Sequence, residues 1–399
     1  MKRKIALLLA MVILMSTMQI NYVSADEETT KTETTEAVEQ VEIKVPMELS
    51  IEEAVKLAVE SDRGMWKIDK TIGELQDARR LGITAKEQYE LITEAPMVAG
   101  SSGLNYFNLI LSKNDYYSKT AELKTKELQR GREQLLKGIE IKTISTYYKL
   151  LVAEKTIEIN QAKLDKANEQ LRVINLKFNN GSETKAGVLR GEMAVQEANT
   201  ELSTAMDDLN IVKLDLLNQL NLPFDTSFVL TDTELTYVPT VELNLDAALE
   251  KAKAERLEII SAQNDLVLQK IETHAYKAYY TSNLWQNKVA VKKLEDAELN
   301  VPQAYKDVEL DVRNTYLNLV KAERALVNMD KTVELSKEAA RINKLLYENG
   351  MATSLDVLEA DTNLAQVEIG RYQLLVAYNL SKLMFDNSNL IGSSSNSDI

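Results

Sequence analysis

The feature that most constrains this chain is an internal repeat, in which part of the second half matches part of the first half at a constant distance. An offset of 169 residues brings Thr146-Tyr147 onto Thr315-Tyr316 and Phe178-Asn-Asn-Gly181 onto Tyr347-Glu-Asn-Gly350, with no insertion between them. Self-similarity over such a distance indicates that one supersecondary unit is built twice. The sequence therefore predicts two related copies in tandem.

A third match marks where each copy begins. Leu49-Ser-Ile-Glu-Glu-Ala54 pairs with Leu243-Asn-Leu-Asp-Ala-Ala248 at an offset of 194 residues. The two offsets differ because the first copy holds 25 additional residues, which we place around 83–117. We assign the copies to residues 47–222 and 243–388, joined by a linker over 223–242.

Within each copy, apolar residues recur every seven positions. This heptad pattern is typical of a coiled coil, and a seven-residue repeat on a 3.6-residue helix imposes a left-handed supercoil. Glycine and proline number only 13 and 5 in 399 residues, so the helices can run long without interruption. The apolar seams are Ile157, Leu164, Leu171, Phe178 and Val195, Leu202, Leu209, Leu216 in the first copy, and Leu326, Val333, Ala340, Tyr347 and Leu364, Val367, Leu374, Tyr378 in the second.

Both copies interrupt these seams at an Asn-Gly pair. Gly181 and Gly350 stand where a helix-ending glycine is expected, and Thr184 and Thr353 can cap the helix that follows. Seams on both sides of so short a connection predict an antiparallel hairpin. The predicted fold class is all-α, with two tandem repeats of long antiparallel coiled-coil helical hairpins. Many seam positions hold alanine or polar residues, so each hairpin needs lateral neighbours to cover its apolar edges.

The first 25 residues have the pattern of a secretory signal peptide. Lys2 to Lys4 are basic, the apolar run from Ile5 to Met15 is short, and Ala25 ends a small-residue stretch suited to cleavage. We therefore predict an exported protein, with an uncleaved membrane anchor as the alternative interpretation. No later stretch approaches the roughly 20 apolar residues of a spanning helix.

Three further segments interrupt the helical pattern. Residues 26–46 are acidic and rich in threonine, which predicts a disordered leader, and residues 389–399 predict a disordered tail. The linker contains Pro223 and Pro239, which stop helices, and a short strand over 227–231 is one interpretation of its apolar residues.

The composition argues against enzymatic chemistry. There is no cysteine and only one histidine, His274, which excludes a thiolate nucleophile and a two-histidine zinc site. The sequence has no glycine-rich phosphate loop and no nucleophile elbow. We predict that the protein is not an enzyme and uses no cofactor or metal. The net charge of −14 disfavours nucleic acid and anionic lipid as partners, and generic solubility is the alternative interpretation of the acidic excess.

Other conspicuous side chains have structural interpretations. Lys163 and Lys166 belong to charged faces that we expect to be solvated. Tyr147 and Tyr316 occupy matching positions in the two copies, and we expect them to pack in the core of each hairpin.

The tip segments resemble a known family. Phe178-x-x-Gly181-x-x-Thr184-x-x-x-Val188-Leu189 and Tyr347-x-x-Gly350-x-x-Thr353-x-x-Asp356-Val357-Leu358 are similar to the two helix-tip motifs of TolC-type outer membrane efflux proteins. The segments 49–58 and 243–252 resemble the short helices that open each repeat in that family. The resemblance extends over most of 47–388.

The resemblance implies a homotrimer whose six hairpins form a hollow α-barrel. It also implies that the tips meet a periplasmic adaptor (membrane fusion) protein and gate the tunnel, while an inner-membrane transporter supplies the energy. Gly181, Thr184, Gly350 and Thr353 are carried over as tip and adaptor-contact residues. Asp356 is carried over as a tunnel constriction, although an acid near a helix start also stabilises the helix dipole. The first copy has Gly187 at the matching position.

The sequence departs from the family in one respect. Each repeat of the family inserts a β-hairpin before the helix that leads to its tip, and such strands need about 9–11 residues of alternating polarity. Neither 92–111 nor 276–300 shows a convincing alternation, and helix is an equally good interpretation of the second segment. We expect reduced or absent β-hairpins, which leaves membrane insertion open and makes an outer membrane location conditional on a barrel.

Two functions follow from these observations. The first is the exit-duct subunit of a trans-envelope efflux or secretion system, acting as a passive channel. The alternative is a non-channel coiled-coil scaffold or interaction protein of the cell envelope or surface. The paired tip motifs favour the first, and the missing strands favour the second.

Overall fold

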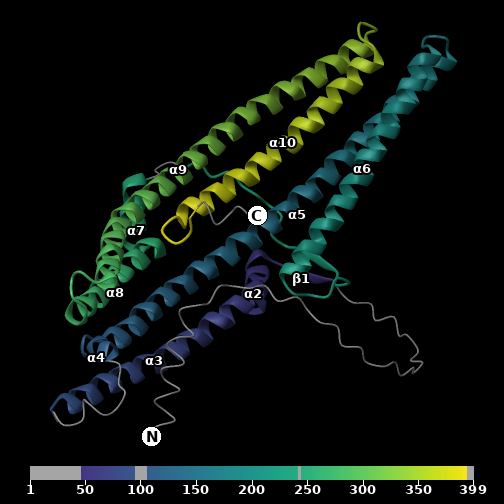
Figure 1. Ribbon diagram of the computed structural model, residues 1–399. Helices are drawn as coiled ribbons and strands as arrows, with labels where there is room; N and C mark the ends of the chain where they lie inside the picture. Colours follow the sequence, from purple (N-terminus) through teal and green to yellow (C-terminus); the bar gives the residue numbers. More distant parts are fainter. Residues whose placement is uncertain (1–45, 95–105, 241–243, 393–399) are drawn as a thin grey trace, which may run out of the picture. The chain divides into compact units, whose positions relative to one another are not determined.

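The computed structural model of the chain describes residues 46–94, 106–240 and 244–392. The predicted signal peptide, 1–25, and nearly all of the predicted leader, 26–46, lie outside the described residues. In the first copy the helices are α2 (Ile51–Ser61), α3 (Arg63–Glu94), α4 (Tyr106–Lys113), α5 (Tyr116–Asn179) and α6 (Lys185–Gln219) (Figure 1). In the second copy they are α7 (Leu245–Glu255), α8 (Leu257–Tyr279), α9 (Trp285–Glu348) and α10 (Ser354–Asp386).

Matching helices of the two copies keep the offsets that the sequence shows. Helices α5 and α9 have 64 residues each, and α2 and α7 have 11 residues each. Between these blocks the copies differ, because α3 has 32 residues whereas α8 has 23, and α4 stands only in the first copy. Part of the surplus of the first copy therefore lengthens α3, and the rest lies between the end of α3 and the start of α5.

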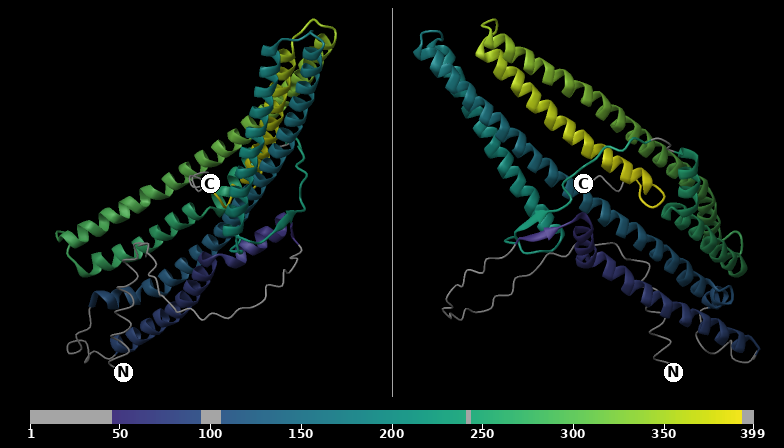
Figure 2. Two further views of the ribbon diagram at one scale, coloured as in Figure 1. Left: turned by 90° about the vertical axis from the view of Figure 1, so that its right-hand side faces the viewer. Right: turned by 180° about the vertical axis from the view of Figure 1, so that it is seen from behind.

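The two hairpins lie side by side and form one layer of helices. Helix α5 packs against α6, α9 packs against α10, and α5 also packs against α10, which gives the order α6–α5–α10–α9 (Figure 2). Toward the other end of α5 and α9, the neighbours are α3, α8 and α7. The predicted all-α class and the two long antiparallel hairpins are confirmed.

A small parallel sheet anchors the start of the first copy. Strand β1 (Met47–Leu49) pairs with β2 (Phe228–Leu230) of the linker, with Glu48 opposite Val229. The side chain of Tyr147 is fully buried beside it, and its hydroxyl donates to the Leu49 carbonyl at 2.9 Å. The short linker strand was one of the interpretations of the sequence, whereas β1 was not expected.

The rest of the linker packs on the second copy. The Tyr378 hydroxyl donates to the Val238 carbonyl at 2.6 Å, and the Glu323 carboxylate accepts from the Thr240 backbone and hydroxyl and from the Tyr237 hydroxyl. Burial opposes ionisation of Glu323, but these hydrogen bonds outweigh it and hold its pKa below the ordinary range. Each copy thus uses one buried tyrosine, Tyr147 or Tyr378, to hold a non-helical segment against its hairpin.

The segments that were examined for strands are helical where the structure describes them. Residues 276–300 belong to α8, to the turn after it and to α9, so the helical interpretation of this segment is the right one. In the first copy, α3 extends to Glu94 and α4 begins at Tyr106, while 95–105 lie outside the described residues. A Lys-rich sequence without alternation has no apolar face for a sheet, and the helix pattern prevails.

Arg256 joins three parts of the second copy at the break between α7 and α8. Its guanidinium is only 3% exposed, and it donates to Asp311 of α9 at 2.9 Å, to Glu258 at 3.0 Å and to the Ser388 carbonyl at 3.0 Å. Asn389 and Ile391 are buried in the same region. The predicted tail, 389–399, therefore starts later than expected, because the chain after α10 closes over Arg256; residues 393–399 lie outside the described residues.

Arg256→Ala should lower the free energy of unfolding by about 2–3 kcal/mol, because it removes a buried cation that bonds to two carboxylates and a carbonyl. The matched control is Arg313→Ala, whose ion pair with Glu309 is exposed on α9 and should be worth less than about 0.5 kcal/mol. Urea unfolding followed by circular dichroism, at one protein concentration, measures both changes. Equal losses in the two variants would show that Arg256 does not hold the junction.

Candidate functional site: the hairpin tips

The first hairpin turns at the end of α5 in a Schellman motif. Gly181 has φ of +73°, and its N–H donates to the Phe178 carbonyl at 2.9 Å while the Ser182 N–H donates to the Lys177 carbonyl at 2.8 Å. These bonds satisfy carbonyls that the last helical turn leaves open. A left-handed conformation is expensive for residues with a Cβ, so the turn requires glycine.

The second hairpin repeats this geometry. Gly350 also has φ of +73°, its N–H donates to the Tyr347 carbonyl at 3.1 Å, and the Met351 N–H donates to the Leu346 carbonyl at 2.8 Å. Gly181 and Gly350 therefore both occupy the C′ position that was expected from the sequence.

The two tips differ in how the returning helix is capped. Thr353 and Asp356 form a reciprocal capping box, in which the Asp356 carboxylate accepts from the Thr353 N–H and hydroxyl, each at 2.7 Å. At the first tip, the Thr184 hydroxyl accepts from the Gly187 N–H at 3.0 Å. The Thr184 N–H donates to the carboxylate of the neighbouring Glu183. The Glu183 side chain lies in the space next to Gly187 and would have to move if this position carried a side chain.

Asp356 is ionised, and its carboxylate caps the N-terminus of α10. The hydroxyl and N–H of Thr353 hold the pKa of Asp356 below its ordinary value. The same carboxylate lines a groove of about 270 Å³ between α9 and α10. The other lining residues are small or polar: Ser336, Ala339, Asn343, Glu359, Ala360 and Asn363. The structure thus places Asp356 where it caps α10 and adds negative charge to a polar groove just below the tip.

Two contacts hold the neighbouring tips together, and the sequence did not reveal either of them. Near the turns, the Lys177 ammonium of α5 lies 3.6 Å from the centre of the Tyr347 ring of α9, in cation–π geometry. Further along, Lys166 of α5 pairs with Asp361 of α10 at 2.9 Å. Lys166 is exposed, as expected from the sequence, but its ion-pair partner lies 195 residues away and was not expected.

Charge pairs also cross each hairpin. Lys163 of α5 bonds to Glu201 of α6 at 2.6 Å, and its side chain is largely buried, so the expectation that it is solvated is also wrong. Arg371 of α10 pairs with Asp330 of α9 in the second hairpin. The expected packing roles are confirmed for Tyr147, which is buried, and for Tyr316, whose ring lies 5.8 Å from that of Phe385.

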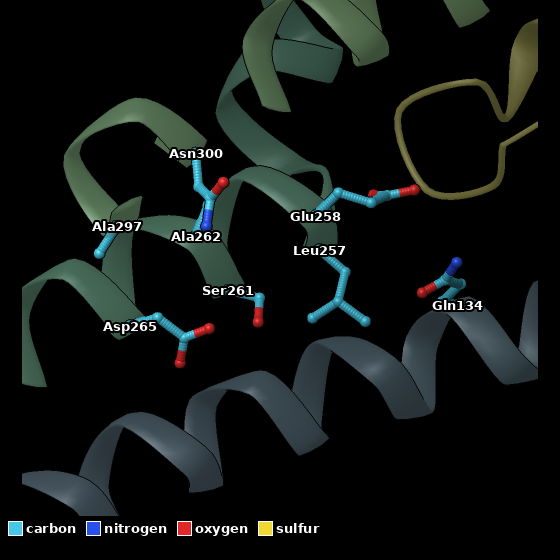
Figure 3. Close-up of a pocket in the computed structure, with 8 residues that line it drawn as sticks. All are labelled: Gln134, Leu257, Glu258, Ser261, Ala262, Asp265, Ala297 and Asn300. Atoms are coloured by element: carbon cyan, nitrogen blue, oxygen red, sulfur yellow. The ribbon is translucent and has the colours of Figure 1, made fainter. Parts of the chain in front are cut away.

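A separate cleft of about 480 Å³ lies between α5 and the pair α8–α9 (Figure 3). Its lining is Gln134 of α5, Leu257, Glu258, Ser261, Ala262 and Asp265 of α8, and Ala297 and Asn300 of α9. These residues are mostly small or polar, and the cleft holds neither a histidine nor a second hydroxyl beside Ser261 that could activate it. The cleft therefore lacks a nucleophile–base arrangement.

Two structural properties of the described residues bear on function. No group of three or more histidine, aspartate or glutamate side chains there is arranged to hold a metal ion. Within residues 46–94, 106–240 and 244–392, no helix combines the length and the apolar composition that crossing a membrane requires.

Comparison with known proteins places the fold. No protein-family model matches the sequence, and no curated protein matches it either. The CmeC outer membrane channel of Campylobacter jejuni matches with a TM-score of 0.65 over 92% of this chain and 95% of that one, at 11% identity. The open-state MtrE outer membrane channel of Neisseria gonorrhoeae matches with a TM-score of 0.61 over 93% and 98%, at 15% identity. The outer membrane protein VceC of Vibrio cholerae matches with a TM-score of 0.64 over 86% and 96%, at 14% identity.

The chain has the fold of the TolC-type outer membrane channels. At this level of identity the similarity establishes the fold, and it confirms at that level the resemblance expected from the two tip motifs.

Gly350→Ala should lower the free energy of unfolding by about 1–2 kcal/mol, because the added Cβ meets no neighbouring atom but forces a left-handed residue to carry a side chain. Gly370→Ala is the control, since Gly370 lies inside α10 with only an ordinary contact to Met329, and it should gain about 0.5–1 kcal/mol. Urea unfolding measures both. A neutral Gly350→Ala would contradict the strained turn.

The capping box predicts a pH dependence confined to the second tip. Since the pKa of Asp356 is lowered by folding, its stabilisation is present above about pH 4 and is lost as the pH falls through the lowered pKa. Amide hydrogen exchange, corrected for intrinsic rates, should show the first turn of α10 less protected at pH 3 than at pH 6, relative to the first turn of α6. Asp356→Asn should abolish this difference, and a difference that survives the substitution would place its origin elsewhere.

Proposed function

We propose that this protein is the exit-duct subunit of a trans-envelope efflux or secretion system, a passive TolC-like channel that closes as a homotrimer. The observation that carries the proposal is that both outer edges of the helix layer, α9 on one side and α6 on the other, display apolar side chains that no part of the described chain covers.

The edge of α9 carries exposed apolar residues on one face, in two groups separated by a charged stretch. These residues are separated by 11, 7, 18 and 7 residues, distances that return to nearly the same face of a 3.6-residue helix. Leu335 is 72% exposed and Leu299 is 69% exposed. This stripe consists of Leu299, Leu310, Leu317, Leu335 and Ile342.

The edge of α6 carries a second stripe. Leu189, Met193, Ile211 and Leu214 are separated by 4, 18 and 3 residues and are all exposed. Because the two edges belong to different helices, contact between them joins one chain to the next head to tail, and such contacts close into a ring when the rotation allows it. The resemblance to the TolC-type family implies that three chains complete the ring.

Burial of the two stripes at an interface between chains would contribute substantially to the stability of a closed ring. Burial of a Leu, Ile or Met side chain contributes about 1.5–3 kcal/mol, so the partly exposed side chains of the two stripes contribute on the order of 10 kcal/mol at each interface. Exposed apolar patches of this extent mark association surfaces.

In the proposed assembly the tips serve recognition and gating. Gly181, Thr184, Gly350 and Thr353 shape the turns that would meet a periplasmic adaptor protein, and Asp356 would add negative charge at a tunnel constriction. An inner-membrane transporter would supply the energy. The Lys177–Tyr347 and Lys166–Asp361 contacts are the bonds that a sliding of one hairpin past the other would have to exchange.

The same proposal gives the location. An exported chain with this fold belongs in the cell envelope, and the matched outer membrane channels favour the outer membrane. The second candidate is a coiled-coil scaffold of the envelope or surface. One observation favours it: residues 276–300 form the end of α8, a short turn and the start of α9, where the channel family was expected to insert strands.

Oligomeric mass tests the proposal directly. Light scattering of the protein without residues 1–25 should give three times the chain mass, and Leu317→Glu with Leu335→Glu should give the mass of one chain, because it places two carboxylates in the interface. Met351→Glu is the matched control, since Met351 is 70% exposed but lies at a tip, away from the stripe, and it should remain trimeric.

Conductance separates the two candidate functions. In planar lipid bilayers the trimer should open pores and the Leu317→Glu, Leu335→Glu variant should not. A monomeric wild type would remove the exit-duct proposal, and a trimer that opens no pore in any lipid would favour the scaffold.

A further inference from the structure

The turn between α8 and α9 lies at the opposite end of α9 from the Gly350 tip (Figure 1). With 64 residues at about 1.5 Å each, the two ends of α9 are about 95 Å apart. The surface at this turn is therefore separate from the surface at the tips.

The charge of this end is opposite to that of the protein. The chain has 61 acidic and 47 basic residues, yet the 22 residues from Thr273 to Leu294 contain no acid. They contain the exposed lysines Lys277, Lys288, Lys292 and Lys293, and none of the four pairs with a carboxylate in the described part of the chain. Glu272 and Glu295 border this segment, so the excess of positive charge is confined to the turn and the adjoining helix ends, where it creates a local positive field that favours an anionic partner.

The same turn displays large amphipathic side chains. Trp285 is 68% exposed, Tyr279 is 45% exposed and Leu284 is also exposed. Tryptophan and tyrosine combine an apolar ring with a polar group, and they are enriched where hydrocarbon meets lipid headgroups. Leu284 adds an apolar side chain that can enter the headgroup region of a bilayer, together with the two aromatic rings.

Aromatic contacts and a hydrogen bond hold the backbone of the α8–α9 turn in place. The Phe107 ring of α4 lies 4.6 Å from that of Tyr276, and Tyr280 stacks on Tyr276 at 5.6 Å. The Asn287 amide also donates to the Tyr280 carbonyl at 2.9 Å. These contacts order the backbone between α8 and α9, so the exposed side chains are presented by a rigid base, which lowers the entropic cost of binding.

We propose that the α8–α9 turn is a membrane-contact surface, which binds anionic lipid headgroups through its lysines and places Leu284, Trp285 and Tyr279 at the depth of the headgroups. It lies on the surface of the bilayer and does not span it, because two short helix ends reach only the interface. This inference is independent of the exit-duct proposal, since it needs neither a pore nor a trimer.

The chain provides its own probe, because Trp66 and Trp285 are its only tryptophans. In the protein without residues 1–25, Trp66→Phe leaves Trp285 as the sole emitter. On addition of phosphatidylglycerol–phosphatidylcholine vesicles, its fluorescence should shift to shorter wavelength and be quenched by brominated lipid. The matched control, Trp285→Phe, leaves Trp66, which is also 68% exposed but lies on α3 beside Lys70, and it should show neither change.

Charge reversal tests the electrostatic part. Lys277→Glu with Lys288→Glu should weaken vesicle binding at least about ten-fold in a flotation assay, and high salt should weaken the wild type similarly. Lys331→Glu with Lys344→Glu, on the far part of α9, should leave binding unchanged. Vesicles of phosphatidylcholine alone should bind much less.

Three results would overturn the inference. Trp285 emission that is unaffected by anionic vesicles removes the membrane contact. Emission that is already at short wavelength without lipid places Trp285 in an interface between copies of the chain. Binding to a soluble polyanion as tight as to vesicles, without a spectral shift, assigns the lysines to a polymer instead. None of these outcomes changes the oligomeric mass, so the exit-duct proposal stands or falls separately.

Discussion

Long helices with narrow apolar seams have to be covered along their whole length, and this need for lateral neighbours underlies the rest of the structure. In α5 the need is met from both sides, by α6 within its own hairpin and by α10 of the other copy. In α6 and α9 it is met on one side only, and Ile211 and Leu317 remain exposed on the other. A layer with two covered and two uncovered members leaves apolar surface along both of its edges, and this surface is the basis of the proposed ring.

The duplication gives the layer its regularity, and the differences between the copies carry specific tasks. Both tips use the same Schellman turn, yet only the second adds an aspartate to the cap, whereas at the first the Glu183 carboxylate accepts from the Thr184 N–H. At the other end the copies diverge further. The first copy continues into a longer α3 and an added α4, and α4 packs its Phe107 against the aromatic residues of α8. The second copy makes a short, lysine-rich turn.

The two ends of the second copy therefore differ in charge. The tip end holds Asp356 and Glu359 in its groove, while the α8–α9 turn holds lysines without acids. The single helix α9 connects these two ends of different charge. The junction around Arg256 sits between these ends and ties α7, α8, α9 and the end of the chain into one unit.

The sequence by itself determined the features whose causes are local: the heptad seams, the glycine at each C′ position, the threonine caps and the equal lengths of matching helices. Periodicity and turn chemistry act over a few residues, so they can be read without knowing what packs against them. Only the tertiary structure decided the partners of Lys166, the pairing of β1 with β2, the burial of Asn389 over Arg256 and the side of each helix that stays exposed. These depend on residues far apart in the chain meeting in space, and the free energy of burial or ion pairing has no local signature until the layer of helices has formed.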